Sequence, residues 1–503
     1  MSLINVLTDR LQAHTYGASA IAVVGFLIVY ALYSRLSQER RINSLGSRAA
    51  IILPCRLPYG FDVAFRIFRS VLNNTLIEVQ QDILKHGHVV QVKMAGSVMV
   101  FSDDPEVFRA CMATQFPDFG KGQLLHDVFQ GSMAEAIFCT DGQVWKRNRS
   151  ILRPHCAKSR IDDLEITESH FAHVLRELGT EGKAIYVWDL VDRYQLDVAT
   201  HVFFGTSTDS LITNKQPFRE AMEKLLKIAS YKMSFGTLGT YLPEWLVAWS
   251  AMQELDRYVH SLHDLATSAK PDAAPDTKGT LMDTLAYLNL DFKTFKAQVT
   301  AIMLGGKDPP ALTMTWAIWE LARHPEVYQQ VREEVRRVCG ISTPPTRTEL
   351  KDCHFVRAVV NEAMRLYHPL AINMKIALRD TTLPIGGGLS GREPLAVLKG
   401  TPVVLSLWSL QRRTDLVGPD ANEFNPSRWA TWTPKQWEFI PFNHGVRTCI
   451  GKNFGQEQVE YLIARLAQEF SRLEVAEEQK LPMKYKFELN VKPLWPCLVK
   501  FVR

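Results

Sequence analysis

The chain has 503 residues, of which 46% are hydrophobic, so it is long enough to bury a large core. Its 58 basic and 53 acidic residues leave a formal charge of +5, which is too balanced to indicate a nucleic-acid-binding surface. The eight cysteines are spread singly without a CxxC pair, which excludes a dense disulfide framework and favours reduced thiols. Length alone would suggest about three domains.

The N-terminal region contains one long uncharged stretch. Residues 15–34 are apolar enough and long enough to cross a bilayer. Four arginines follow before residue 49 and one precedes the stretch, so the positive-inside rule puts the rest of the chain in the cytosol. We expect a luminal N-terminus at 1–14, a transmembrane anchor at 15–34 and a linker at 35–60, stiffened by Pro54 and Pro58. A buried core helix is the alternative interpretation of the apolar stretch.

Residues 61–503 show mainly helical periodicity, which predicts a fold class that is mainly α with minor β, that is, α+β. The helical segments are Phe218 to Ala229, Phe292 to Arg323, Glu326 to Val338, Leu350 to Leu366 and Gln456 to Phe470. The strand candidates are Val89 to Lys93, Val98 to Phe101, Pro402 to Leu407 and Leu498 to Val502. The polar, proline-bearing segment 268–279 predicts a surface loop and not a domain boundary.

Two short helical motifs pair residues of interest on one face. Trp145 and Arg149 are four residues apart in DGQVWKRNRSILRP, which brings them nearly onto one helix face. Taken alone, they fit a solvated basic helix with one buried aromatic side chain. Glu362 and Arg365 are three apart in VVNEAMRLYHP and can pair, although such a pair is usually an ordinary surface salt bridge.

The longest helical segment, Phe292 to Arg323, has the unusual centre GGKDPPA at residues 305–311. A proline inside a helix removes an N–H donor and clashes with the preceding turn. Pro309 and Pro310 in a row therefore predict a kink or a local opening, which the two preceding glycines would ease. A role only in shaping a pocket is the alternative.

A cysteine-centred segment, FNHGVRTCIG from Phe442 to Gly451, runs directly into the last helical pattern. Gly445 and Gly451 permit a tight loop and close backbone approach to a flat ligand. Cys449 falls at or just before a helix start, where unpaired N–H groups and the dipole lower a thiol pKa. A cysteine between glycines is by itself more often a buried free thiol.

The full ten-residue segment resembles the haem-binding loop of the cytochrome P450 family, FxxGxRxCxG, and matches every fixed position. The resemblance extends from about Pro54 to the C-terminus in the family's motif order. It implies one compact catalytic domain at 61–503, in place of three domains, with haem b buried between the long central helix and the cysteine loop. Cys449 would supply the axial thiolate, which pushes electron density toward the iron and favours O–O cleavage.

The resemblance also implies roles for the other motifs. Arg447, Trp145 and Arg149 would contact haem propionates through charge-assisted hydrogen bonds. Glu362 and Arg365 would be joined by Arg428, from FNPSRW, in a buried structural triad behind the haem loop.

The segment 371–388 resembles a fungal branch of the family that hydroxylates alkanes and fatty acids. In that branch an arginine stands where this chain has Lys375, so a propionate contact there would be a point charge and not a fork.

One position departs from the family pattern. Relatives usually have an acid followed by threonine in the central helix, and here Asp308 is followed by Pro309. The threonine hydroxyl usually organises proton delivery for O–O cleavage, and Pro309 cannot donate a proton. Either a substrate hydroxyl or ordered water acts with Asp308 in a monooxygenase of narrow scope, or the enzyme is an isomerase or dehydratase without net oxygen use. Peroxide-driven oxidation, desaturation or ring closure is a further alternative.

The implied partners are an NADPH-cytochrome P450 reductase, with cytochrome b5 as a further candidate, and the endoplasmic reticulum membrane, with the catalytic domain facing the cytosol. The candidate residues for reductase contact are Arg412, Arg413, Lys435 and Lys452. Two regions, 116–138 and 204–249, would line the pocket for a lipophilic molecule, such as a fungal secondary-metabolite intermediate or a fatty-acyl chain. Their candidate lining residues are Phe119, Leu124, Leu125, Phe129, Phe235, Leu238 and Tyr241. A non-catalytic haem binder or membrane scaffold is the competing hypothesis.

Overall fold

The structure is a computed structural model that describes residues 25, 26, 29, 33, 34, 36–157, 163–179, 182–213, 216–242, 244–268 and 279–503. The predicted luminal segment 1–14, most of the predicted anchor 15–34 and most of the loop 268–279 lie outside the described residues. Within the described ranges, no helix has both the length and the apolar character needed to span a membrane.

The body is mainly helical, as the sequence predicts. The long helices are α2 (Phe61–Leu72), α6 (Gly142–Ala157), α7 (Asp163–Glu177), α8 (Val187–Phe204), α9 (Pro217–Ser234), α12 (Trp249–Ser268), α14 (Phe292–Arg323), α15 (Pro325–Val338), α17 (His354–Leu366) and α20 (Lys452–Glu469). The short α-helices are α3 (Leu76–Leu84), α4 (Pro105–Arg109), α5 (Gly122–Val128), α10 (Thr237–Thr240), α11 (Glu244–Val247), α13 (Leu281–Tyr287), α16 (Arg347–Asp352), α18 (Leu407–Leu410) and α19 (Thr414–Val417). Single turns of other helix types are η1 (Pro58–Gly60), η2 (Ala110–Thr114), η3 (Phe116–Asp118), η4 (Pro426–Ala430) and η5 (Gly445–Arg447).

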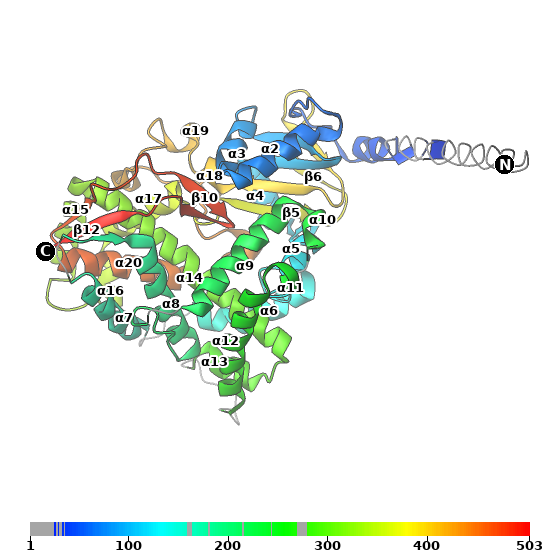
Figure 1. The fold of residues 1–503 in the computed structure, drawn as a ribbon. Helices are drawn as coiled ribbons and strands as arrows, with labels where there is room; N and C mark the ends of the chain where they lie inside the picture. The colour runs from blue at the N-terminus through cyan, green and yellow to red at the C-terminus, as the bar shows by residue number, and fades with distance from the viewer. Residues whose placement is uncertain are drawn as a thin grey trace, which may run out of the picture.

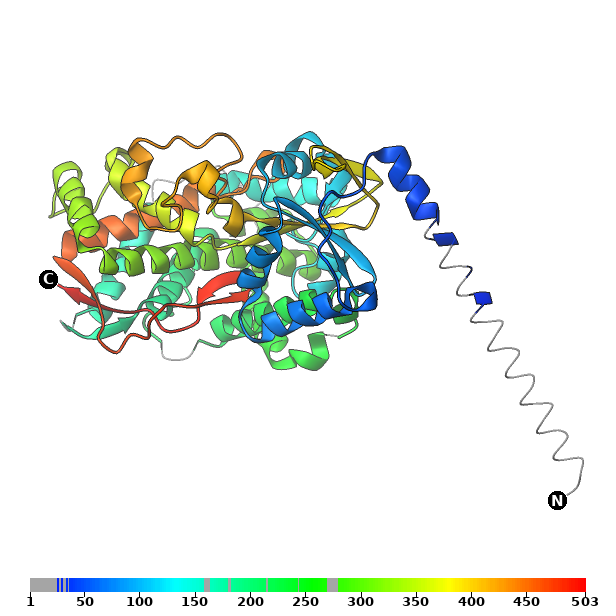
Figure 2. The same ribbon diagram turned by 90° about the horizontal axis from the view of Figure 1, so that it is seen from above.

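The strands form small sheets at two ends of the body. The largest sheet has the order β1-β2-β8-β5-β3, with β2 and β8 parallel and the other pairs antiparallel. Its strands are β1 (Val89–Met94), β2 (Ser97–Ser102), β3 (Phe119–Gly120), β5 (Ile372–Ala377) and β8 (Pro402–Ser406). The others are the ribbon β6 (Thr381–Gly387) and β7 (Glu393–Val397), the ribbon β10 (Tyr485–Glu488) and β11 (Asn490–Pro493), and the sheet of β4 (Ala184–Tyr186), β12 (Leu498–Val502) and β9 (Arg472–Val475). Figures 1 and 2 show the largest sheet, with α2 and α3 beside it, across the body from the C-terminal strand β12.

Helix α14 passes through the middle of the body and packs against α8 and α20 (Figure 2). Its side chains are apolar around most of the helix, which is typical of a fully buried helix. Asp291 caps its start by accepting a hydrogen bond from the Thr294 N–H at 3.0 Å. Buried Trp316 and Trp319 anchor its second half in the main core.

Helix α14 is helical without interruption from Phe292 to Arg323, so the predicted local opening at the prolines is wrong. The alternative, a kink, stays a prediction. Pro310 lacks the N–H that would bond the carbonyl of Gly306, four residues earlier. The Gln195 side-chain amide on α8 donates to that carbonyl instead, at 2.8 Å. A tertiary hydrogen bond thus replaces one that the sequence removes, and close packing keeps the helix intact.

Another expectation needs correction, because the single predicted helix Leu350 to Leu366 is two helices, α16 and α17, separated at Cys353. Glu334 on α15 accepts hydrogen bonds from the backbone N–H groups of Phe355 and Val356 at 2.8 to 2.9 Å. These hydrogen bonds pair backbone N–H groups that have no partner within α17, and so they favour the start of a new helix there.

Candidate active site

The Cys449 loop has a backbone that only glycine allows at one position. Gly445 has a φ of +69°, and a Cβ there would lie 2.2 Å from the carbonyl oxygen of Met112 in η2. The loop closes when the Cys449 N–H donates to the Phe442 carbonyl at 2.9 Å. Helix α20 begins at Lys452, so the cysteine lies just before a helix start, as its sequence position indicates.

The Cys449 thiol is exposed, although protein surrounds it closely enough for burial to raise its pKa. The Gly451 N–H and the Arg149 guanidinium lower that pKa, but their effect is smaller than that of burial. The expected lowering by an N–H group at the helix start is thus present, but burial outweighs it. A metal ion bound to the sulfur would hold it as a thiolate, because a coordinating thiol is deprotonated.

Two arginines and a tryptophan connect the loop to α6. Arg149 Nη1 donates to the Thr448 carbonyl at 3.0 Å. The Arg447 guanidinium is 4.7 Å from the centre of the Trp145 ring, and that of Arg149 is 5.7 Å from it. Arg447 also donates to the Thr140 carbonyl at 2.9 Å, while its Nε is buried without a hydrogen-bond partner. The structure thus brings Arg447 next to Trp145 and Arg149, which lie about 300 positions earlier in the sequence.

Lys375, on β5, is the most unusual group at this site. Its side chain is fully buried, and its Nζ has no hydrogen-bond partner. Burial holds the pKa of Lys375 well below its usual range, and the nearby cations Lys121 and Arg447 lower it further. An unpartnered buried ammonium group is costly unless an anion binds it.

Lys121 and Asp141 belong to the same cluster, although sequence reasoning did not identify either. Burial lowers the pKa of Lys121 to about 8. Asp141 forms an ion pair with Arg447 and accepts hydrogen bonds from the N–H groups of Lys121 and Gly122. Asp141 thus pairs with Arg447 and also acts electrostatically on Lys121 and Lys375. Haem b carries two propionates, so its charge fits this cluster.

On α14, Gly305 is exposed although most of the helix is buried, and a Cβ there would meet nothing within 4 Å. Pro309, one turn later on the same face, is half-buried. Near this point α14 approaches α20, because a Cβ on Gly455 would lie 3.7 Å from Pro310. Gly305 and Pro309 therefore leave an open stretch on one face of α14.

Asp308 is fully buried, and its carboxylate contacts other side chains of the protein. Its Oδ1 lies 2.6 Å from the Lys307 Nζ, and its Oδ2 accepts a hydrogen bond from the Asn490 side chain at 3.1 Å. Lys307 also contacts Asp192 on α8 at 2.5 Å, and Asp192 pairs with Arg219 on α9. Asp308 is thus one member of a buried ionic network.

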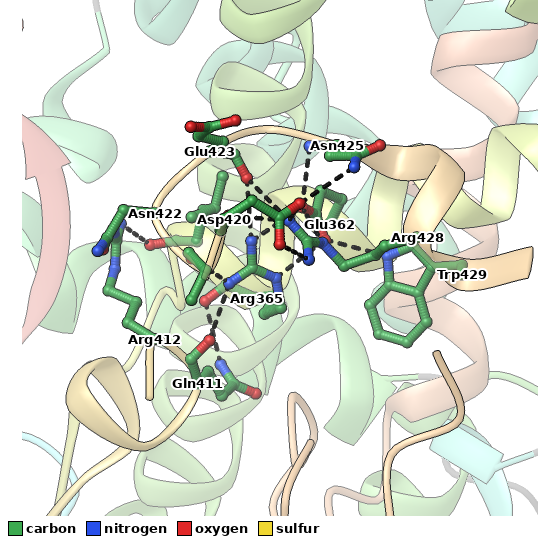
Figure 3. Close-up of polar contacts among 12 residues, drawn as sticks. Glu362, Arg365, Gln411, Arg412, Asp420, Asn422, Glu423, Asn425, Arg428 and Trp429 are labelled. Atoms are coloured by element: carbon green, nitrogen blue, oxygen red, sulfur yellow. Dashed lines mark hydrogen bonds and ion pairs between the residues drawn. The ribbon is translucent and has the colours of Figure 1, made fainter. Parts of the chain in front are cut away.

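Glu362, Arg365 and Arg428 form one buried cluster (Figure 3). Arg365 donates twice to the Glu362 carboxylate, at 2.8 and 2.9 Å, and Arg428 Nε donates at 2.9 Å. The Trp429 indole and the Asn425 backbone N–H complete the shell at 3.1 and 3.0 Å. Sequence reasoning missed these last two donors, although both lie within three residues of Arg428.

The four basic residues predicted for reductase contact differ in exposure. Arg412 is half-buried, stacks at 4.2 Å on the Trp408 ring and donates to the Leu366 carbonyl. Arg413 donates to the Asp103 carbonyl and pairs with Asp415. These two side chains are thus partly engaged within the chain, and their contact with a reductase stays a prediction. Lys435 and Lys452 are exposed.

The predicted pocket residues also separate into groups. Phe129 lines a small apolar pocket between α9 and α14, with Leu125 and Leu124 packed in the adjoining cluster. Phe119 instead belongs to the core around the largest sheet. Phe235 and Tyr241 are 44% and 81% exposed, so they do not line that pocket. The pocket's lining residues are Phe129, Ser132, Met133, Met222, Leu225, Leu226, Thr300 and Leu304.

Comparison with known proteins gives a consistent result. The family model described as Cytochrome P450 matches residues 67–499. Cytochrome P450 monooxygenase pvhE of Talaromyces variabilis is 30% identical over 94% of this chain and 92% of its own length. Cytochrome P450 52A3-A of Candida maltosa is 33% identical over 77% of this chain and 78% of its own length. Cytochrome P450 52E1 of Candida apicola is 28% identical over 99% of both chains.

These relatives are fungal, as the resemblance in the sequence implied. The family binds haem b through a cysteine thiolate, which agrees with the cysteine loop and the cation cluster. With the mainly helical fold, the loop and the family match together, this chain belongs to the cytochrome P450 family and is a haem-thiolate monooxygenase, an oxidoreductase.

Proposed function

We propose that Cys449 is the axial ligand of haem b and that the enzyme oxidises a lipophilic small molecule. The observation that carries this assignment is the cation cluster beside the Cys449 loop. Lys375 has a buried Nζ without a partner, Arg447 has a free buried Nε, and Asp141 is the neighbouring carboxylate. Two propionates would supply the missing negative charge and the missing acceptors.

Haem bound in this way supplies oxygen activation at its iron. The chain's own residues would then do the positioning. Arg447 and Lys375 hold the propionates, with Arg149 and Trp145 close enough to contribute. Gly445 lets the loop pass close to η2, and the open face at Gly305 leaves room on the opposite side. Spectroscopy and product analysis of a Cys449→Ser variant test the assignment. The absorption band of sulfur-ligated haem and the product should both be lost.

Proton delivery is where this enzyme would differ from its relatives. Pro309 has no donor, and both Asp308 oxygens have partners within 3.1 Å. A monooxygenase of this kind would rely on a substrate hydroxyl or an ordered water to deliver protons. The need for such a group would narrow the range of substrates. The same observations favour the second candidate function, an isomerase, a dehydratase or a peroxide-using enzyme that consumes no net O2.

Replacement of Pro309 by threonine separates these alternatives. In a monooxygenase, the new hydroxyl should change the ratio of hydrogen peroxide leaked to product formed. If neither quantity changes, Pro309 has only a structural role. Turnover with NADPH and reductase, compared with and without oxygen, gives the second measurement. Oxygen-independent conversion would support the isomerase or dehydratase.

The substrate we propose is a fungal secondary-metabolite intermediate or a fatty-acyl chain. The side chains between α9 and α14 are mainly apolar, including Met133, Met222 and Leu226, and the space that they leave has room for about one water molecule. Their apolar character supports the lipophilic assignment. Comparison of metabolites between a deletion strain and its parent identifies the molecule directly. Accumulation of a water-soluble, charged precursor would contradict the lipophilic assignment.

We propose that NADPH-cytochrome P450 reductase docks on the basic face near the Cys449 loop, with cytochrome b5 as a further candidate. Lys146, Arg147 and Arg153 are exposed on α6, whose Arg149 contacts the loop. Lys452 is exposed at the start of α20. A Lys146→Glu/Arg147→Glu variant should weaken reductase-supported turnover, and the loss should shrink in high salt. Unchanged turnover would exclude this face.

The proposed location is the endoplasmic reticulum membrane, with residues 15–34 as a single-pass anchor and the body facing the cytosol. Supporting this, Phe61 and Phe65 on α2 are 55% and 64% exposed. The Phe68 ring on the same helix lies 4.9 Å from that of Phe235, tilted by 47°, and Phe235 is itself 44% exposed. Such a patch is typical of a membrane contact. Cell fractionation with and without residues 1–34 tests the anchor.

A further inference from the structure

Two cysteines that the sequence places 14 residues apart lie in contact. The Sγ atoms of Cys339 and Cys353 are 3.5 Å apart. Cys339 directly follows α15, and Cys353 separates α16 from α17. The sequence offered no CxxC pair, so the contact arises only from how these helices fold.

The surroundings hold the pair in place. The Cys339 N–H donates to the Val335 carbonyl at 2.8 Å, and the Cys353 N–H donates to that of Glu349 at 3.1 Å. Glu334 of α15 accepts from the N–H groups at the start of α17, which ties the two helices together. The two sulfurs, 3.5 Å apart, need to come about 1.5 Å closer to form a disulfide bond.

Both cysteines are buried, and Cys339 is the one that adjoins an exposed segment. Cys339 is 5% exposed and Cys353 is fully buried. Residues 340–344, next along the chain, are all exposed, including Ile341 at 56%. The contact with Cys353 lowers the pKa of the Cys339 thiol, which makes Cys339 the better nucleophile of the two.

We propose that Cys339 and Cys353 are a redox modification site that hydrogen peroxide closes to a disulfide. The Cys339 sulfur attacks hydrogen peroxide, the O–O bond breaks, and a sulfenic acid and one water form. The Cys353 sulfur then attacks the sulfenic sulfur, the S–S bond forms, and the hydroxyl leaves with the Cys353 proton as a second water. Both thiols are oxidised, and one hydrogen peroxide is reduced to two waters.

Forming the disulfide would affect α17, which begins just after Cys353 and carries Glu362 and Arg365. The disulfide would join the end of α15 to the start of α17 and close the loop between them. Cross-linking a loop of this length restricts the unfolded chain. The oxidised enzyme should therefore unfold at a higher temperature than the reduced enzyme, and a thiol reductant should reverse the shift.

The test treats the full-length holoenzyme with graded hydrogen peroxide, then unfolds it in denaturant, blocks free thiols with a maleimide and maps peptides by mass spectrometry. We expect a cross-linked peptide containing Cys339 and Cys353, loss of maleimide labelling at both, and an upward thermal shift. Cys339→Ser and Cys353→Ser should each abolish the cross-link and the shift. Cys55→Ser is the matched control, because Cys55 is half-buried and is not part of the pair.

The outcome that overturns the proposal is peroxide oxidation at Cys55 or elsewhere while both members of the pair stay labelled. A cross-linked peptide without any thermal shift would overturn the stabilising consequence. Peptide mapping of the wild-type enzyme keeps the test valid even if a serine variant folds poorly.

Discussion

The buried Glu362 carboxylate should contribute several kcal/mol to the free energy of unfolding. Its replacement by glutamine tests this prediction. Glu362 and Arg365 are fully buried, and Arg428 is 6% exposed. Glu362→Gln keeps the shape but leaves two guanidinium groups without their shared counter-charge. Loss of one partner of a buried ion pair costs about 3–5 kcal/mol. For 503 residues, an unfolding entropy of about 1 kcal/mol per kelvin converts this to a fall of roughly 3–5 °C in the thermal midpoint.

The measurement is calorimetry or circular dichroism of the haem-loaded enzyme. Asp415→Asn is the matched control, because it removes a carboxylate from an arginine pair whose acid is 56% exposed. An exposed pair is worth less than about 1 kcal/mol, so the control should shift by less than about 1 °C. If the two variants unfold at the same temperature, the cluster of Glu362 is not a buried anchor of the fold.

Three further predictions concern the loop, the propionate cluster and a surface histidine. Gly445→Ala should greatly reduce haem retention because its Cβ meets Met112, whereas Gly96→Ala, at a φ of +83° in open space, should not. Lys375→Met should speed haem transfer to apomyoglobin at least about tenfold and Lys375→Arg much less, because the charge is what matters; equal rates would contradict this. His88 forms a hydrogen bond with Asp103, which raises the pKa of His88 above its usual value of 6.5. The bond therefore stabilises the fold fully below pH 6.5, and this stabilisation is lost as the pH rises through the folded-state pKa of His88. His88→Asn should therefore lower the free energy of unfolding at about pH 5.5 by less than about 1 kcal/mol, and not at about pH 8.5; the opposite pH dependence would contradict the pairing.

Much of the helical body could be predicted from the sequence. The segment Phe292 to Arg323 matches α14 at both ends, and Leu498 to Val502 matches β12. Strong periodicity and clear caps determine such elements locally. The Cys449 loop was predictable for a similar reason, because its glycines and its cysteine are adjacent in the chain.

What the sequence could not reveal depends on contacts between distant segments. Gln195 replaces the hydrogen bond that Pro310 removes, and no local rule identifies a donor 111 residues away. Asp141 acts electrostatically on Lys375, although the two residues are far apart in the chain. The outward position of Tyr241 likewise depends on tertiary packing, since its residue type alone favours a buried site.

The most direct test of the haem assignment is the absorption spectrum of the purified protein, reduced and exposed to carbon monoxide. The wild-type protein should show the red-shifted band of sulfur-ligated haem, and Cys111→Ser, which alters a buried cysteine near Lys375, should keep it. Cys449→Ser should lose the band together with turnover. A Cys449→Ser protein that retains both would contradict the assignment of Cys449 as the haem ligand.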